Sequence, residues 1–131
     1  MDAEGMWEWY KNTDFNPIRG AVASLSGYLK DYCETREPKN AVRARRAVPP
    51  LRRDFSALEI PEGIEDLQPL SGPALALIEA VDALETLAEH PVCDKKSLVN
   101  PAASVALASI EHCEGLRVVA RAYDTTATVA T

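Results

Sequence analysis

Residues 73–89 read PALALIEAVDALETLAE, and this stretch decides the fold class of the chain. Apolar side chains recur at helical spacing on one face, and carboxylates gather on the opposite face. Proline stands at the first position, where its fixed φ angle suits a helix start, and Pro91 follows the last turn. We therefore predict an amphipathic helix over residues 73–89. Its buried face is expected to carry Leu77, Ile78, Val81, Leu84 and Ala88.

The N-terminal half of the chain carries three more helix signals. A cap residue precedes Pro17, and apolar residues then recur at spacings of three and four over residues 17–34. Shorter helices are predicted over residues 39–48 and 51–58, separated by two prolines that are expected to stop the first of them. The face opposite the apolar stripe of residues 17–34 carries the small residues Gly20, Ser24 and Gly27. Small side chains let another backbone approach closely, although solvent exposure is equally allowed.

The C-terminal third of the chain predicts a last helix from Asn100-Pro101 onward. Gly115 is its weak point, because glycine inside a helix costs about 1 kcal/mol relative to alanine. A break there would allow a short β-hairpin after Gly115, but we predict a continuous helix with a frayed tail over residues 124–131. One apolar face collects Ala102, Val105, Ser109, His112, Leu116, Val119 and Tyr123. Because Leu107, Ile110 and Val118 lie across from them, the helix is expected to be buried on two sides, with a central place in the bundle.

Length and composition predict a single helical domain over residues 1–131. The chain is 47% hydrophobic but only 6% aromatic, so its core must consist mostly of Leu, Val, Ile and Ala, which suits close helix packing. Residues 59–72 are rich in helix breakers and are expected to form a long connection, with one helical turn near residues 62–67. The predicted fold class is all-α, a compact bundle of about four to five helices.

Several sequence features bear on where the protein works. No stretch of about 18 apolar residues occurs, and the N-terminus lacks a signal-peptide pattern. Three cysteines at scattered positions argue against a secreted disulfide framework. We therefore expect a cytoplasmic protein with no membrane partner.

Charge is segregated along the chain, whose net charge is −6. Residues 36–53 hold seven basic side chains against one acid, whereas residues 54–94 hold ten acids and no lysine or arginine. This asymmetry is the main functional clue in the sequence, because such blocks often mark interaction surfaces.

The arginine-rich segment, residues 36–53, is the best candidate for direct function. Arginine suits bidentate contacts with phosphate or carboxylate groups. The segment is expected to bind a partner protein or, without sequence preference, a nucleic-acid backbone, since no aromatic residue interleaves the arginines for base stacking. Alternatively, it pairs with the acidic helix of the same chain. The candidate residues are Arg36, Lys39, Arg43, Arg45, Arg46, Arg52 and Arg53, of which Arg43, Arg45, Arg46, Arg52 and Arg53 are expected along one side.

The acidic face of the helix over residues 73–89 is expected to interact with positive charge. Like charges three and four residues apart destabilise a helix, so a cationic group is expected to relieve them. That group belongs either to the arginines of this chain or to a basic groove on a partner protein, and a plainly solvated face is a third reading. The residues of this acidic partner face are Glu79, Asp82, Glu85 and Glu89.

The first fifteen residues hold half of the aromatic side chains. Trp7, Trp9 and Tyr10 form an N-terminal aromatic arm that is expected either to dock on a neighbouring subunit or to fold back over the open end of the bundle. We favour the second reading, because the core is otherwise short of aromatics.

Catalytic and metal-binding patterns are weak. His90 and Cys93 have acceptable spacing for half of a zinc site, but His112 and Cys113 are adjacent on a predicted helix and their side chains diverge. No nucleophile elbow, phosphate loop, zinc-protease or dinucleotide motif occurs. We therefore predict no enzyme activity, no metal, no cofactor and no small-molecule substrate.

These observations predict a non-enzymatic interaction protein, a small helical subunit or adaptor that joins a larger assembly through charge-segregated surfaces. Two alternatives stay open at this point. One is binding to a nucleic-acid backbone through residues 36–53, and the other is an acidic inhibitor that docks on a basic groove of a partner protein.

Overall fold

The structure, a computed structural model, describes residues 2–91 and 96–130, with backbone alone for residues 96–98, 100 and 123–130. It confirms an all-α fold, and the described residues contain no strand. One 3-10 turn, η1, lies in the connection before α5. The elements are α1 (Ala3–Asn12), α2 (Asn16–Thr35), α3 (Pro38–Arg46), α4 (Val48–Ser56), η1 (Ile64–Leu67), α5 (Gly72–Glu89) and α6 (Lys96–Ala130).

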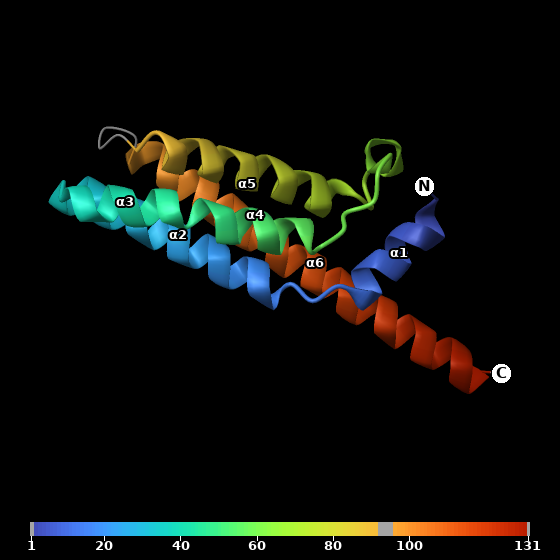
Figure 1. The fold of residues 1–131 in the computed structure, drawn as a ribbon. Coiled ribbons are helices and arrows are strands. Elements are labelled where there is room, and N and C mark those ends of the chain that lie inside the picture. Colours follow the sequence, from blue (N-terminus) through green and yellow to red (C-terminus); the bar gives the residue numbers. More distant parts are fainter. Residues whose placement is uncertain (1, 92–95, 131) are drawn as a thin grey trace.

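The helices form an up-and-down bundle of four rods (Figure 1). The first rod is α2, the second is α3 followed end to end by α4, and the third and fourth are α5 and α6. Each rod runs antiparallel to the one before it, and α6 packs against α5, α2 and α1. Helix α6 extends past the other rods at its C-terminal end.

The second rod consists of two helices that follow each other end to end, without a change of direction, near the two prolines. Helix α3 ends at Arg46, and α4 begins two residues later at Val48. The prolines lie in the first turn of α4, where a missing N–H leaves no intrahelical bond unmade. The prediction that they stop the preceding helix was therefore wrong in mechanism, since they start the next one.

Helix α5 has the predicted bounds within one residue, and its apolar face forms the centre of the core. Leu77 and Leu84 are fully buried, and Ile78 is half-buried at the edge of the same face. The helix packs most extensively on α6 and also contacts α2, α3 and α4. Its starting region is tied to the connection before it, because the Ser71 hydroxyl donates a hydrogen bond to the Ile64 carbonyl.

Helix α6 is continuous through Gly115, which confirms the predicted helix in preference to the hairpin. It begins at Lys96 rather than at Asn100, and it continues to Ala130 across the residues expected to fray. The predicted buried face is wrong for Val105, His112 and Val119, which are exposed. Among the α6 side chains that the structure describes, the buried ones are Val99, Ala103, Ala106, Ser109, Ile110, Cys113 and Ala120.

The alanines explain this difference in the buried face of α6. Both faces of the helix are apolar, so periodicity could not choose between them. Alanine lets neighbouring backbones approach closely, and α6 contacts three other helices along its length. The crowded side therefore carries mostly small side chains beside Val99 and Ile110, whereas Val118 and Val119 face outward, 67% and 56% exposed.

Helix α1 was not predicted as a helix. The Asp2 carboxylate caps it by accepting a hydrogen bond from the Gly5 N–H at 2.8 Å. Met6 and Tyr10, one turn apart, are fully buried against the bundle, and the backbone of Lys11 accepts a hydrogen bond from Arg121 of α6 at 3.2 Å. The N-terminal segment is thus a packed element of the fold.

Candidate functional site

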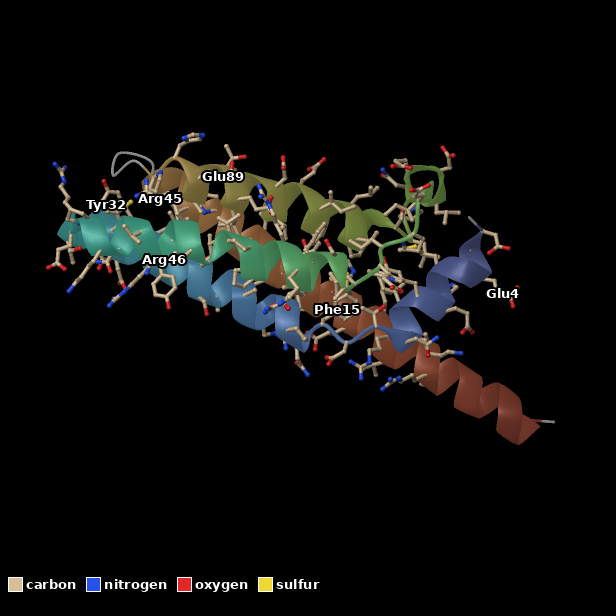
Figure 2. All side chains as sticks on the ribbon, in the orientation of Figure 1. Glu4, Phe15, Tyr32, Arg45, Arg46 and Glu89 are labelled. Atoms are coloured by element: carbon tan, nitrogen blue, oxygen red, sulfur yellow. The ribbon has the colours of Figure 1, made fainter. Side chains whose placement is uncertain are left out.

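The structure divides the arginine-rich segment into groups that face different directions. Adjacent side chains on a helix diverge by about 100°. Figure 2 shows Arg46 on the side of α3 where α2 lies, whereas Arg45 points away from that side. Lys39 lies 2.9 Å from the Glu37 carboxylate, near the start of α3. The five arginines at positions 43, 45, 46, 52 and 53 therefore do not form the single side that the sequence predicted.

Arg52 pairs with the acidic helix of the same chain. Its Nε lies 3.3 Å from Glu85 Oε2, and its terminal nitrogen donates to Glu89. The hydrogen bond that Arg52 donates to Glu85, together with the charges of Glu85 and Glu89, raises the pKa of Arg52 above its ordinary value. These contacts join α4 to α5 and relieve part of the like-charge repulsion along α5.

The other half of the acidic face remains exposed. Glu79 and Asp82 lie on the solvent side of α5, and neither has an ion pair with any side chain that the structure describes. The four carboxylates predicted as one partner face are thus split into an internally paired half and a solvated half.

Arg43 and Arg46 line a groove on the outer surface between α2 and the α3–α4 rod. This feature, called the outer groove below, has a volume of about 520 Å³. Its lining includes small or apolar residues of both rods, called the floor below: Gly20, Ala21 and Ser24 from α2, and Ala47 and Pro50 from the second rod. The predicted small face of α2 therefore lies beside the predicted arginines, a juxtaposition that follows from the antiparallel pairing of the two rods.

The outer groove has ends of opposite charge. Tyr28 of α2 lies at the same end as Arg43 and Arg46, while Asn16 and Asp54 lie at the other end, because the rods are antiparallel. Both arginines are exposed, and neither is ion-paired with a carboxylate of the described side chains. Asp54 is half-buried, with its Oδ1 3.5 Å from Arg53 Nε. The groove therefore offers two guanidinium groups to an external anion.

The aromatic arm lies against the bundle, at the end where α2 begins. The Tyr10 hydroxyl donates a hydrogen bond to the Leu70 carbonyl at 2.8 Å, and the Trp9 indole N–H donates to the Leu58 carbonyl at 2.7 Å. Trp9 also packs edge-to-face on Phe15, with ring centroids 5.6 Å apart. Trp9 and Tyr10 thus hold the long connection before α5, and only Trp7 of the three lacks such a tie among the described residues.

The histidines and cysteines are dispersed. His112 lies beside the first turn of α5, near Gly72 and Pro73, whereas His90 follows the last turn of the same helix. The two histidines are therefore separated by the length of α5. Cys93 lies outside the described residues, and within them no group of three or more His, Cys, Asp or Glu could hold a metal ion. None of the described helices is both long and apolar enough to cross a bilayer.

Comparisons of the chain with protein-family models, with curated proteins and with solved structures find no match.

Two residues of the outer groove carried no signal in the sequence. Tyr28 appears only as one of the scattered aromatics, and Asp54 appears as the first acid after the arginines. Their positions in the groove depend on which face of α2 meets the second rod. The sequence showed the small face of α2 and the arginines separately, and only the packing of the rods brought them together.

Burial makes Cys113 a testable titrating group. It is fully buried, and desolvation raises the pKa of its thiol to about 12. An unfolded cysteine has a pKa of about 8.5, so above that pH the unfolded state binds fewer protons than the folded state. The titration of Cys113 is therefore expected to leave the free energy of unfolding unchanged below about pH 8.5 and to lower it by about 1.4 kcal/mol per pH unit between that pH and about 12.

The measurement is urea unfolding at about pH 7 and about pH 9.5, compared between the wild type and Cys113→Ala. The variant is expected to be less stable at neutral pH but to lose less stability on going to the higher pH. Tyr10 titrates later, because burial raises its pKa above the ordinary value near 10. Equal pH dependence in the two proteins would contradict the buried position of the Cys113 thiol.

Proposed function

We propose that the protein is a non-enzymatic interaction subunit that binds an acidic partner protein through Arg43 and Arg46. The observation that carries this proposal is the contrast between the arginines. Arg52 is already paired with Glu85 and Glu89, whereas Arg43 and Arg46 line a groove without a carboxylate partner among the described side chains. Guanidinium groups recognise carboxylates bidentately, and arginine is enriched at protein interfaces.

A protein partner fits these features better than a nucleic-acid backbone. Tight backbone binding neutralises several phosphates along one surface, but here Arg45 points away from Arg46, and Arg52 reaches carboxylates of α5. The outer groove also contains the Asp54 carboxylate, which repels phosphate. Its floor of small and apolar residues suits protein side chains.

An acidic inhibitor that uses α5 has less support. Half of its four carboxylates, Glu85 and Glu89, are occupied by Arg52, so docking on a basic groove would have to break these ion pairs. Only Glu79 and Asp82 remain exposed without an ion pair to a described side chain. The arginines are therefore the better candidate contact.

Reversing the two arginine charges tests the proposal. The double substitution Arg43→Glu and Arg46→Glu should weaken partner binding by roughly tenfold or more, because it places like charges against the carboxylates of the partner. The measurement is quantitative affinity capture from the native cell, with isotope-labelled comparison of the proteins recovered. The matched control is Arg36→Glu with Arg45→Glu, which changes the net charge equally but lies outside the groove lining.

The proposal requires that the control retain the captured partner while the groove variant loses it. Equal recovery with both variants would contradict a specific role of Arg43 and Arg46. A mobility-shift assay with duplex DNA and RNA, at about 50 mM and about 200 mM salt, tests the nucleic-acid alternative. If the wild type binds nucleic acid at the lower salt and the double variant Arg43→Glu with Arg46→Glu does not, the partner is a nucleic-acid backbone rather than a protein.

A further inference from the structure

The floor of the outer groove contains space that the protein itself does not fill. A Cβ atom built at Gly20 meets no atom within 4 Å, so a side chain from outside the protein could approach the α2 backbone there. The neighbouring floor residues Ala21, Ser24 and Ala47 are also small. Small residues of this kind permit close packing of another helix on a helical surface.

The backbone of the groove walls restricts the kind of occupant. Both walls are α-helices, whose N–H and C=O groups bond within the helix and offer no edge to an added strand. An extended segment would leave its own backbone groups unpaired against this floor. A helix satisfies its backbone internally, so helix-in-groove docking is the mode that fits.

The length of the groove fits a short helix. Its lining on α2 runs from Asn16 to Tyr28, and a rise of about 1.5 Å per residue makes this distance about 18 Å. A helix of about twelve residues, or three turns, covers the same distance. The occupant must also carry carboxylates at the end that lies beside Arg43 and Arg46.

We infer that the outer groove binds an amphipathic helix of the partner protein, about three turns long, with small apolar residues on one face and carboxylates at one end. The inference rests on the proposed function, since it assigns a shape to the acidic partner contact. Charge complementarity selects this occupant: Arg43 and Arg46 attract carboxylates at one end, and Asp54 disfavours them at the other.

The test uses substitutions that fill the groove without changing its charge. Gly20→Leu places a side chain in the open space of the floor, and Gly27→Leu is the matched control on the same helix. A Cβ at Gly27 also meets no atom within 4 Å, but Gly27 does not line the groove. Both variants should fold, because leucine favours a helix more than glycine does, and thermal unfolding followed by circular dichroism checks this.

The probes are fluorescein-labelled helical peptides of about twelve residues, each with alanine and leucine on one face and glutamates at one end. A second set carries lysine in place of glutamate. Fluorescence anisotropy with the full-length protein should show binding of at least one glutamate peptide and weaker binding of every lysine peptide. Gly20→Leu should weaken the glutamate peptide at least tenfold, and Gly27→Leu should leave its binding within about twofold of the wild type.

Suppose that the double variant Arg43→Glu with Arg46→Glu loses the glutamate peptide but Gly20→Leu still binds it like the wild type. This result would overturn the groove inference and leave the proposed function standing. The inference also fails if no glutamate peptide binds, or if glutamate and lysine peptides bind equally. Sedimentation of the protein without peptide tests the remaining occupant. Self-association that Gly20→Leu abolishes would identify a second copy of this chain in the groove and would overturn the partner helix.

Discussion

Replacing Tyr10 by alanine is expected to lower the free energy of unfolding by about 3–5 kcal/mol, the range for deleting a large buried aromatic side chain. Tyr10 is fully buried, and its ring packs edge-to-face on Trp9 with centroids 5.1 Å apart. Its hydroxyl donates to the Leu70 carbonyl at 2.8 Å, which ties α1 to the connection that leads into α5. The substitution therefore removes apolar contacts and a hydrogen bond at once. Urea unfolding at neutral pH measures the loss.

Two controls separate the parts of this effect. Tyr10→Phe keeps the ring but leaves the Leu70 carbonyl without its donor, and it should cost about 1–3 kcal/mol. Trp7→Ala removes a half-buried aromatic side chain of the same helix and should cost less than Tyr10→Ala. A change of under about 1 kcal/mol in Tyr10→Ala would mean that the N-terminal helix is not part of the core, and docking of the aromatic arm on a subunit would return as an explanation.

Gly115 should respond in opposite directions to alanine and to proline. It lies inside α6, and a Cβ there meets no atom within 4 Å, so Gly115→Ala should raise the free energy of unfolding by up to about 1 kcal/mol. Gly115→Pro removes a helical hydrogen bond and brings its ring against the carbonyl one turn earlier, so it should cost about 3 kcal/mol or more. Both are measured by urea unfolding.

The pair of substitutions also tests the hairpin alternative. A glycine at a chain reversal often has a positive φ angle, where alanine would be destabilising. A loss of stability in Gly115→Ala would therefore contradict the continuous helix. Gly20→Ala serves as a reference, because Gly20 is also exposed inside a helix and has open space at its Cβ position.

Local sequence signals were sufficient for most helices. Residues 73–89 combine a proline start, one apolar face and one charged face, so the expected helix agrees with α5 within one residue. Helix α2 follows the same rule with Pro17 in its first turn. Helix α1 was not predicted, although Asp2 is a cap residue and Met6 and Tyr10 are one turn apart, because ten residues hold too few apolar positions to define a helical stripe.

The candidate site could be predicted only in pieces. The exposed arginines and the small face of α2 were both visible in the sequence, but not their proximity. The arginines of residues 36–53 make different contacts, since Arg52 donates a hydrogen bond to Glu85 on α5 while Arg46 lies beside α2. A linear charge count treats them as equivalent, because it does not include the direction in which each side chain leaves its helix.

The all-α class, the amphipathic α5 and the segregation of charge follow from the order of residues alone, since they depend on spacing within one segment. The outer groove, the pairing of Arg52 and the buried face of α6 depend on contacts between segments far apart in the chain. On α6, Ala103, Ala106 and Cys113 are buried while Val105, Val118 and Val119 are exposed, because the neighbouring helices approach the side that carries the small residues. Periodicity marks a face as apolar, but the available space decides which apolar face is covered.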